Sequence, residues 1–320
     1  MADRLSLLLE TRPWLLADGA TGTNLYNMGL APGEAPDLWN ETNPGKVLDL
    51  HKAMVAAGAD LILTNSFGAN RSRLRLSNAV DKVAALNHRA ASLAREAADA
   101  TGREVLVAGS MGPTGELMAP MGRLTEADAT AMFTEQAEAL KAGGADLLWI
   151  ETISAVEELR AAAQAARAVD LPWCGMMSFE PGGRTMMGVT PMQLASLVER
   201  LRRPTVAYGA NCGTGPTELL QAVAGFAAAG SERPMIAKPN AGVPRYHDDG
   251  LIYDATPSVM AEFAVLARDL GVRLIGGCCG TTPLHLAAMR DALDQQPRGP
   301  RPTAETISKR MDHAMAQAEE

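Results

Sequence analysis

The sequence predicts an α/β fold, specifically a (β/α)8 TIM barrel. Short, continuously apolar segments, typical of strands covered on both faces, recur along the chain. The segments between them repeat apolar residues with the helical period. Eight strand-then-helix units in series favour a closed barrel. The competing doubly wound open sheet usually has a G-x-G-x-x-G turn after its first strand, and this sequence has none there.

The strand assignments rest on the apolar segments, and the helix assignments on the signals at helix ends. Several expected helices begin with proline, which is favoured at the first helical position, and one ends before Gly143 and Gly144. The expected strands are residues 14–18, 60–65, 105–111, 146–151, 173–179, 205–211, 234–239 and 272–276. The expected helices are residues 46–57, 80–101, 125–142, 155–168, 191–202, 216–229, 257–269 and 283–293.

A change of composition near residue 294 predicts the domain organisation. Residues 1–294 are expected to form the barrel domain, and residues 295–302, which contain three prolines, a linker. Residues 303–320 are expected to form a short helix with Ile307, Met311 and Met315 on one face. This helix either packs on the barrel wall or serves as a docking arm for a partner.

Composition and charge exclude several classes of function. The chain has 320 residues, 47% of them hydrophobic, and a net charge of −8. Without a basic stripe it is not expected to bind nucleic acid or an anionic membrane. No apolar run approaches the roughly 20 residues that a membrane span needs. The apolar residues 7–9 are flanked by charges, unlike a signal peptide, so a cytoplasmic location is expected.

Three cysteines are predicted to meet at one end of the barrel. Cys212 ends the sixth expected strand, and Cys278 and Cys279 follow the eighth. Barrel enzymes use the carboxyl ends of their strands, and strands six and eight lie two apart around the ring. Three thiolates suit zinc, and the absence of a nearby His leaves a coordination position open for a substrate thiol. The fourth cysteine, Cys174, lies within a strand and is expected in the core.

Two acidic residues at strand ends suit the other end of an amino-acid substrate. Asp18 is followed by Gly19 and Gly22, in a turn whose backbone N–H groups can hold a carboxylate. Glu151 ends an otherwise apolar strand, where a buried charge is costly unless it meets a cation such as a substrate ammonium. For each acid, a helix cap or a buried structural ion pair is the alternative.

At these positions the sequence resembles the homocysteine S-methyltransferase family, whose paired-cysteine signature corresponds to residues 276–281 here. The other matching segments are residues 18–23, 64–67, 112–116, 150–152, 209–212 and 239–242.

The resemblance implies a zinc (β/α)8 barrel that methylates the thiol of homocysteine to form methionine. One zinc ion would be held by the three cysteines, with the fourth position left for the substrate thiolate. The acids would lie near the substrate ammonium, the loop amides would take its carboxylate, and a polar side chain would lie close to the metal. The residues that match the family's three cysteines are Cys212, Cys278 and Cys279. The expected substrate contacts are Asp18, Gly19, Thr21, Asn65, Glu151, Asn211 and Asn240.

The methyl donor has two candidate classes. Betaine and related onium donors, such as S-methylmethionine or dimethylsulfoniopropionate, favour aromatic faces around the cation. Where the betaine-using members place tyrosines, this chain has Thr152 and Gly68, which leaves Trp39 and Tyr208 as candidate aromatics.

Other details resemble the homocysteine domain of cobalamin-dependent methionine synthase, namely residues 112–117, 177–179, 183–188 and 239–242. Because little sequence follows Cys279, methylcobalamin is expected to arrive on a separate protein. The candidate side chains for a docking mouth are Met118, Met121, Met186 and Met187.

Two rival functions remain open from the sequence. Lys238, at the end of the seventh expected strand, is positioned as the Schiff-base lysine of a barrel aldolase would be. Alternatively, the chain is a non-catalytic protein that senses zinc or an amino acid.

Overall fold

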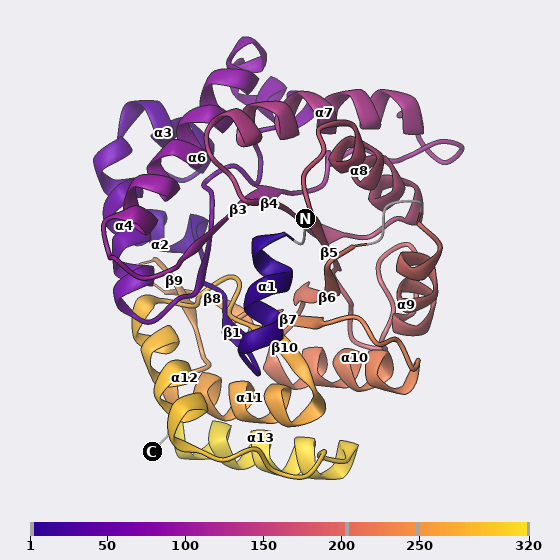
Figure 1. Cartoon of the computed structure of the whole chain (residues 1–320). Coiled ribbons are helices and arrows are strands. Elements are labelled where there is room, and N and C mark those ends of the chain that lie inside the picture. The colour runs from indigo at the N-terminus through magenta and orange to yellow at the C-terminus, as the bar shows by residue number, and fades with distance from the viewer. Residues whose placement is uncertain (1–2, 202–204, 248–249, 319–320) are drawn as a thin grey trace.

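The computed structural model describes residues 3–201, 205–247 and 250–318, and its barrel confirms the fold predicted from the sequence. Eight parallel strands pair in the order β1-β10-β7-β6-β5-β4-β3-β2. A bridge between Ala17 and Leu61 joins the first strand to the second and closes the ring (Figure 1). The strands are β1 (Leu15–Leu16), β2 (Leu61–Leu63), β3 (Leu106–Met111), β4 (Leu147–Ile153), β5 (Trp173–Met177), β6 (Ala207–Cys212), β7 (Met235–Pro239) and β10 (Val272–Ile275).

The helices surround the strands, as expected from the alternating pattern (Figure 1). The large helices are α4 (Pro44–Ala56), α6 (Val83–Asp99), α7 (Glu126–Ala142), α8 (Val156–Ala168), α9 (Pro191–Arg200), α10 (Pro216–Ala228), α11 (Pro257–Leu270) and α12 (Pro283–Gln295). The expected helix 80–101 begins with a 3-10 turn, η3 (Val80–Lys82), and residue 202 of the expected helix 191–202 lies outside the described residues. Short elements without a predicted counterpart are α2 (Gly22–Asn27), η1 (Pro36–Leu38), α3 (Trp39–Thr42), α5 (Arg71–Leu74) and η2 (Arg75–Ser77).

Alternate strand residues fill the inside of the barrel. Trp149 and Cys174 point into this interior cluster, whereas Leu148 and Ile150 belong to the cluster between strands and helices. Cys174 is fully buried, which confirms its expected place in the core, and burial raises the pKa of its thiol. Both faces of each strand are therefore dry, which is why the strands read as continuous apolar runs.

The amino-terminal end of the barrel is closed by α1 (Arg4–Thr11), a helix not predicted from the sequence. Its Leu5, Leu8 and Leu9 belong to the interior cluster, and Figure 1 shows the helix across the centre of the ring. Beside it, the buried Asp60 carboxylate accepts hydrogen bonds from Arg12 at 2.9 Å and from Arg290 at 3.1 Å. At this end of the barrel, ionic contacts therefore connect the segment before β1, the segment before β2 and helix α12.

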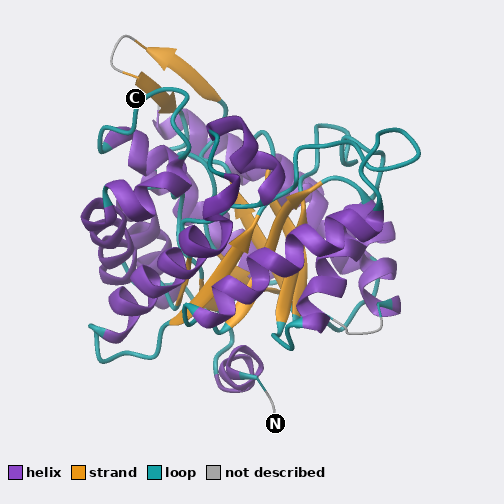
Figure 2. Cartoon of the chain, turned by 90° about the horizontal axis from the view of Figure 1, so that it is seen from above, coloured by secondary structure: helices purple, strands orange, loops and turns teal. Residues whose placement is uncertain are grey.

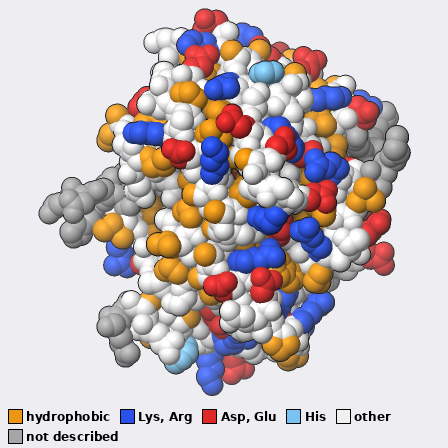
Figure 3. Space-filling view, turned by 60° about the vertical axis from the view of Figure 1, so that its left-hand side comes forward, with side chains coloured by type: hydrophobic (Ala, Val, Ile, Leu, Met, Phe, Trp, Pro, Cys, Tyr) orange, Lys and Arg blue, Asp and Glu red, His pale blue; other side chains and the backbone are white. Residues whose placement is uncertain are grey.

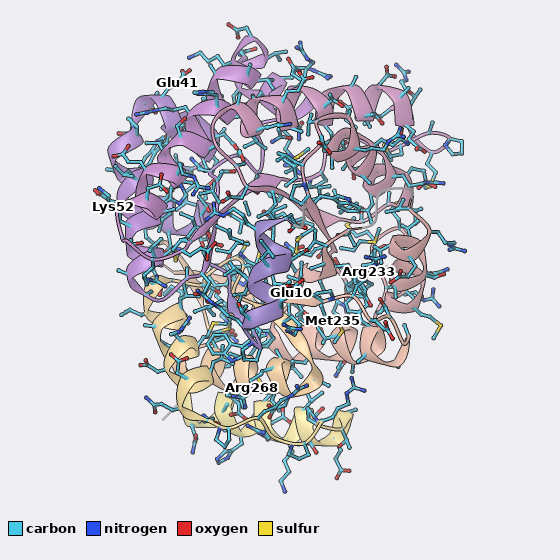
Figure 4. The ribbon with its side chains drawn as sticks, viewed as in Figure 1. Glu10, Glu41, Lys52, Arg233, Met235 and Arg268 are labelled. Carbon is cyan, nitrogen blue, oxygen red and sulfur yellow. The ribbon has the colours of Figure 1, made fainter. Side chains whose placement is uncertain are left out.

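The carboxyl-terminal segment ends in α13 (Ala304–Ala318), and residues 319–320 of the predicted helix lie outside the described residues. Ile307 and Met311 are fully buried, so the helix packs on the barrel wall. Arg268 of α11 donates to the carbonyl oxygen of Pro297 at 2.8 Å, and Figure 4 shows it where α11 faces this segment. The helix is thus a wall element; the domain boundary at residue 294 stays a prediction.

The opposite end of the barrel carries the long loops and an antiparallel hairpin, β8 (Pro244–His247) with β9 (Gly250–Tyr253) (Figure 2). This hairpin was not predicted, because its strands are short and its residues do not form an apolar run. It follows β7, so it stands at the carboxyl ends of the strands, away from α1.

Charged side chains of both signs lie on the surface (Figure 3). On the face in Figure 3, acidic and basic side chains are interspersed. Among the described residues, no helix combines the length and hydropathy needed to cross a membrane.

The buried His51 of α4 predicts a pH dependence of stability. Its Nε2 lacks a hydrogen-bond partner among the described residues, and burial lowers its pKa to about 4. The unfolded chain takes up a proton near pH 6.5, whereas the folded chain resists protonation down to about 4, so stability falls as the pH drops between these values. Between pH 7 and pH 5, the free energy of unfolding of the wild-type protein, measured in urea, should fall by about 2 kcal/mol more than that of His51→Leu. Equal losses in the two proteins would contradict this assignment.

Candidate metal centre and substrate cavity

A cavity of about 460 Å³ opens at the carboxyl ends of the strands. It falls within the size range of small-molecule sites, and this end of a barrel is where such enzymes work. The strand residues Ser110, Glu151 and Lys238 form what we call the cavity floor, and loops that follow β1, β2 and β10 form its sides.

Three of the four cysteines meet at this cavity. The Sγ atoms of Cys212, Cys278 and Cys279 all lie within 4.8 Å of one another. No His, Asp or Glu among the described residues joins this group. Three soft sulfur ligands fit a zinc ion and leave a fourth tetrahedral position without a protein ligand from these residue types.

Asn240 holds the two cysteine-bearing loops together. Its side-chain oxygen accepts a hydrogen bond from the backbone N–H of Cys279 at 3.0 Å, and its amide nitrogen donates to the carbonyl oxygen of Gly213 at 2.6 Å. The backbone N–H of Cys278 donates to the carbonyl oxygen of Pro239 at 2.6 Å. The segment that follows β7 therefore fixes the sulfur positions from between the two loops.

Glycine is required where the paired cysteines turn. A Cβ atom on Gly277 would come within 2.2 Å of the Thr281 hydroxyl oxygen. At Gly280, which has a φ of +78°, it would come within 2.2 Å of the Tyr253 ring. Only residues without a side chain let both neighbouring sulfurs face the same point.

The three thiols share protons unequally. Hydrogen bonds with Cys278 and Cys279 lower the pKa of Cys212 to about 3. Hydrogen bonding with Cys212 raises the pKa of Cys279 to about 12 and also raises that of Cys278. A first negative charge thus forms readily on this cluster, while the remaining protons would be displaced by a bound cation.

Glu151 is the acidic residue of the cavity floor; a second acid, Asp37, lines the side of the cavity and accepts a hydrogen bond from the Gly68 backbone N–H at 3.0 Å. Ser110 donates its hydroxyl hydrogen to Glu151 Oε1 at 2.6 Å, and Asn211 donates to Oε2 at a longer 3.4 Å. Burial raises the pKa of Glu151 to about 7, and the positive charge of Lys238 opposes that shift. A buried carboxyl without a direct cationic partner suits a ligand that brings its own positive charge.

Asn211 supports both the acid and the metal cluster. Its side-chain oxygen accepts from the Thr152 backbone N–H, and its amide nitrogen donates to the Thr152 hydroxyl, both at 2.8 Å. The same nitrogen lies 3.8 Å from Cys278 Sγ. Thr152 and Cys212 have φ values of +62° and +64°, conformations that are rare for residues with a side chain and that occur preferentially at functional sites.

Asp18 lies beneath the cavity and is not among its lining residues. Its Oδ1 accepts a hydrogen bond from the Lys238 ammonium at 2.7 Å, and its Oδ2 accepts from the Leu63 backbone N–H at 2.7 Å. Burial raises the pKa of Asp18, and Lys238 counteracts this. The sequence placed Asp18 beside the substrate ammonium; in the structure the ammonium beside it belongs to Lys238.

The remaining predicted contacts line the cavity in different ways. The backbone N–H groups of Gly19 and Thr21 have no acceptor among the described residues, as a carboxylate-binding loop requires. Asn65 also lines the cavity, but its amide nitrogen already donates to Pro36 at 2.8 Å and to Asn40 at 3.2 Å. Its side-chain oxygen is the group that remains for a ligand.

Several residues of the site were missed by the sequence interpretation. Ser110 lies in the expected strand 105–111 and Lys238 in the expected strand 234–239, but neither was given a part in substrate binding. Tyr253, whose hydroxyl hydrogen-bonds to Cys279 beside the cavity, was missed because the hairpin that carries it was not predicted.

The aromatic candidates were also misplaced. Trp39 and Tyr208 do not line the cavity: Trp39 donates to Glu34, and Tyr208 packs against Phe226 inside the wall. The aromatic side chains that do line it are Tyr26 and Phe67.

Comparison with known proteins agrees with this geometry. Residues 15–293 match the family model described as homocysteine S-methyltransferase. The chain is 31% identical to methionine synthase of Mycobacterium tuberculosis in a 295-residue alignment, which covers 87% of this chain and 24% of that protein. It is also 31% identical to methionine synthase of Mycobacterium leprae, over 89% of this chain and 25% of that protein. The chain thus spans about a quarter of the length of these curated relatives.

A solved structure resembles the whole barrel. The homocysteine methyltransferase MmuM from Escherichia coli, in its metallated form, superposes with a TM-score of 0.75 at 26% identity. The match covers 90% of this chain and 99% of that one. With the family model spanning nearly the entire barrel and the cysteine triad assembled at its mouth, the chain belongs to the homocysteine S-methyltransferase family.

Proposed function

We propose that this protein transfers a methyl group to the thiol of homocysteine to form methionine, using one zinc ion held by Cys212, Cys278 and Cys279. The observation that carries the proposal is the set of three converging sulfurs beside Glu151, in one cavity with free backbone N–H groups. The sulfurs suit a thiol-activating metal, and the acid and the amides suit an ammonium and a carboxylate. A small amino acid with a thiol side chain carries all three of these groups: the thiol, the ammonium and the carboxylate.

The site residues divide the work of binding and orientation. A zinc ion bound to the three sulfurs would favour the thiolate form of a substrate thiol at neutral pH. Glu151 holds the substrate ammonium, and the backbone N–H groups of Gly19 and Thr21 hold its carboxylate. Asn240 keeps the cysteine loops in register. The substrate sulfur is thereby held facing the cavity mouth.

Methyl transfer then needs only an in-line approach. The substrate sulfur forms a bond to the methyl carbon while the bond between that carbon and the donor breaks, and the electron pair of the broken bond leaves with the donor. Correct placement of the two reactants accounts for much of the rate in such a step. No protein base is required at the sulfur.

We further propose that the donor is methylcobalamin carried by a separate protein. Among the described residues, every exposed large hydrophobic side chain except Leu7 follows the carboxyl end of a strand, on the side of the cavity mouth. We call seven of these, all on loops or the hairpin that follow β2, β3, β5 and β7, the mouth patch, and exposed apolar patches mark interaction sites. The mouth patch consists of Leu76, Leu117, Met121, Met186, Met187, Val243 and Ile252. Met118, expected in the same role, is buried.

A small onium donor, such as betaine, S-methylmethionine or dimethylsulfoniopropionate, is the second candidate. Tyr26 and Phe67 favour it, because both line the cavity and aromatic faces attract cations. However, the guanidinium of Arg73 already lies 5.6 Å from the centre of the Phe67 ring. The described cavity residues therefore do not offer a ready aromatic cage.

The two rival functions receive less support. The Lys238 Nζ is engaged by Asp18 at 2.7 Å, whereas a Schiff base needs a lysine nitrogen that is free to attack a carbonyl carbon. A non-catalytic sensor would not need an open metal position facing a cavity mouth.

Loss of one sulfur ligand should remove both metal and activity. We expect Cys279→Ser to lose bound zinc and methionine formation, because a hydroxyl is a poor substitute for a thiolate ligand. Cys174→Ala, which removes a sulfur from the barrel interior, should retain one zinc per chain. Metal content by elemental analysis and methionine formation test both variants. Activity of the metal-free protein would refute the zinc scheme.

The donor can be identified by one parallel assay. The zinc-loaded protein and homocysteine are incubated with methylcobalamin, betaine, dimethylsulfoniopropionate or S-methylmethionine, and methionine is measured. We expect turnover with methylcobalamin, faster when a cobalamin-binding protein presents it. Turnover with one of the onium compounds alone would replace the corrinoid proposal with the second candidate.

The mouth patch should be needed for a protein-borne donor. Met186→Asp should slow transfer from a methylcobalamin-loaded carrier protein by roughly 10-fold, because it places a charge in an apolar contact. Leu7→Asp, an equally drastic change at the opposite end of the barrel, is the matched control. Equal rates for the two variants would argue against docking at the mouth.

A further inference from the structure

The loop that follows β1 lies against the turn that carries the paired cysteines. We call residues 18–23 the carboxylate loop and residues 276–281 the cysteine turn. The backbone N–H of Gly280, in the turn, donates a hydrogen bond to the hydroxyl oxygen of Thr23, in the loop, at 3.0 Å. The two ends of the cavity, one for the metal and one for the substrate carboxylate, are therefore in direct contact.

Asn24 strengthens this contact from behind the loop. It belongs to α2, and its side chain is buried. Its amide nitrogen donates to the Ala20 carbonyl oxygen at 2.7 Å and to the Thr281 carbonyl oxygen at 2.9 Å. The Ala20 backbone N–H donates to the same Thr281 oxygen at 3.0 Å. One buried amide thus bridges a carbonyl group of the carboxylate loop and a carbonyl group of the cysteine turn.

These bonds set the direction of the two free N–H groups in the loop. In a trans peptide group, the carbonyl oxygen and the N–H of the next residue point in opposite directions. The Asp18 carbonyl oxygen accepts from the Gly277 N–H at 3.1 Å, which fixes the opposite-facing Gly19 N–H. The Ala20 carbonyl oxygen is held by the bridging amide, which fixes the Thr21 N–H in the same way. Both N–H groups are therefore aimed by bonds that lead back to the cysteine turn.

We propose that Asn24 is a positioning residue that aims the Thr21 N–H at the substrate carboxylate and couples carboxylate binding to metal binding. This inference rests on the proposed function, since it concerns how the carboxylate of the thiol amino acid is bound. It adds a link between the two ends of the site, although Asn24 itself contacts neither the metal nor the substrate.

The physical reason is pre-organisation. An N–H group that is fixed before the ligand arrives does not have to be ordered when the ligand binds. Without the Asn24 amide, the peptide group between Ala20 and Thr21 loses the partner of its oxygen and must be ordered by the ligand. A metal ion held by the sulfurs orders the cysteine turn, and the hydrogen bonds pass this order to the carboxylate loop. Two ligands that favour the same arrangement bind cooperatively, by the same factor in both directions.

The first test compares two thiols that differ only in the carboxylate. The dissociation constants of homocysteine and of 3-aminopropanethiol, which lacks the carboxylate, are measured by calorimetry on the zinc-loaded protein. We expect Asn24→Ala to weaken homocysteine binding by roughly 10-fold, as for a lost hydrogen bond to a charged group. Binding of 3-aminopropanethiol should stay unchanged, and the zinc content should remain one ion per chain.

Asn87→Ala is the matched control. Asn87 of α6 is also buried, and it also donates to the carbonyl oxygen four residues earlier and to that of a distant loop residue, in this case Val83 and Ala69, both at 2.8 Å. Thermal unfolding should show that both variants are folded, and Asn87→Ala should keep the wild-type preference for homocysteine. An unchanged preference in Asn24→Ala, or an equal loss of affinity for both thiols, would overturn the proposal.

The wild-type protein alone tests the coupling. Zinc affinity is measured by competition with a chromophoric chelator in the presence of L-2-aminobutyrate, which has the ammonium and the carboxylate but no thiol. The D enantiomer at the same concentration corrects for zinc bound by the free amino acid. We expect the L enantiomer to raise zinc affinity by roughly 5-fold or more, within the usual range of couplings between sites. Equal zinc affinities with the two enantiomers would show that the metal and carboxylate sites are independent, and would overturn the proposal.

The proposed function has its own, separate readout. A wild-type protein that binds no zinc, or that fails to methylate homocysteine with any donor, would overturn the function. A wild-type protein that methylates homocysteine, together with an unchanged preference in Asn24→Ala or with no coupling, would overturn only the role given to Asn24.

Discussion

The side chain of Asn240 makes two hydrogen bonds that hold the site together. The closed ring places β7 between the two cysteine-bearing strands, β6 and β10. Asn240 follows β7 and reaches the Gly213 carbonyl on one side and the Cys279 N–H on the other. The three sulfurs converge because this segment is tied to both loops. Any metal chemistry at this site depends on these hydrogen bonds and on the closure of the barrel beneath the loops.

Conformational strain is concentrated around the same cluster. Thr152 and Cys212 both adopt positive φ values, and such residues persist only where their surroundings hold them in place. Asn211, between them in space, accepts from the Thr152 N–H and donates to its hydroxyl. Thr152 is thus held by two hydrogen bonds, and Cys212 ends β6 directly after Asn211. This unusual backbone therefore lies where the Cys212 sulfur meets the pair that follows β10.

The buried charges show how a fold can separate two similar residues. Asp18 and Glu151 both end barrel strands and look equivalent in the sequence. In the structure Asp18 is neutralised by Lys238, a residue more than 200 positions away, while Glu151 keeps a face toward the cavity. The difference arises from which strand lies next to which in the ring. No local pattern around either acid contains that information.

Local periodicity and residue chemistry were sufficient for the barrel, its eight core strands and the meeting of Cys212 with Cys278 and Cys279. Strands buried on both faces leave a continuous apolar signal, and strand ends converge in any closed parallel barrel. The remaining features depend on contacts between distant segments. They are the pairing of Asp18 with Lys238, the burial of Met118, and the positions of Trp39 and Tyr208 outside the cavity lining. The helix α1 and the β8–β9 hairpin belong with them, because short elements are stabilised by the surface they cover and not by their own periodicity.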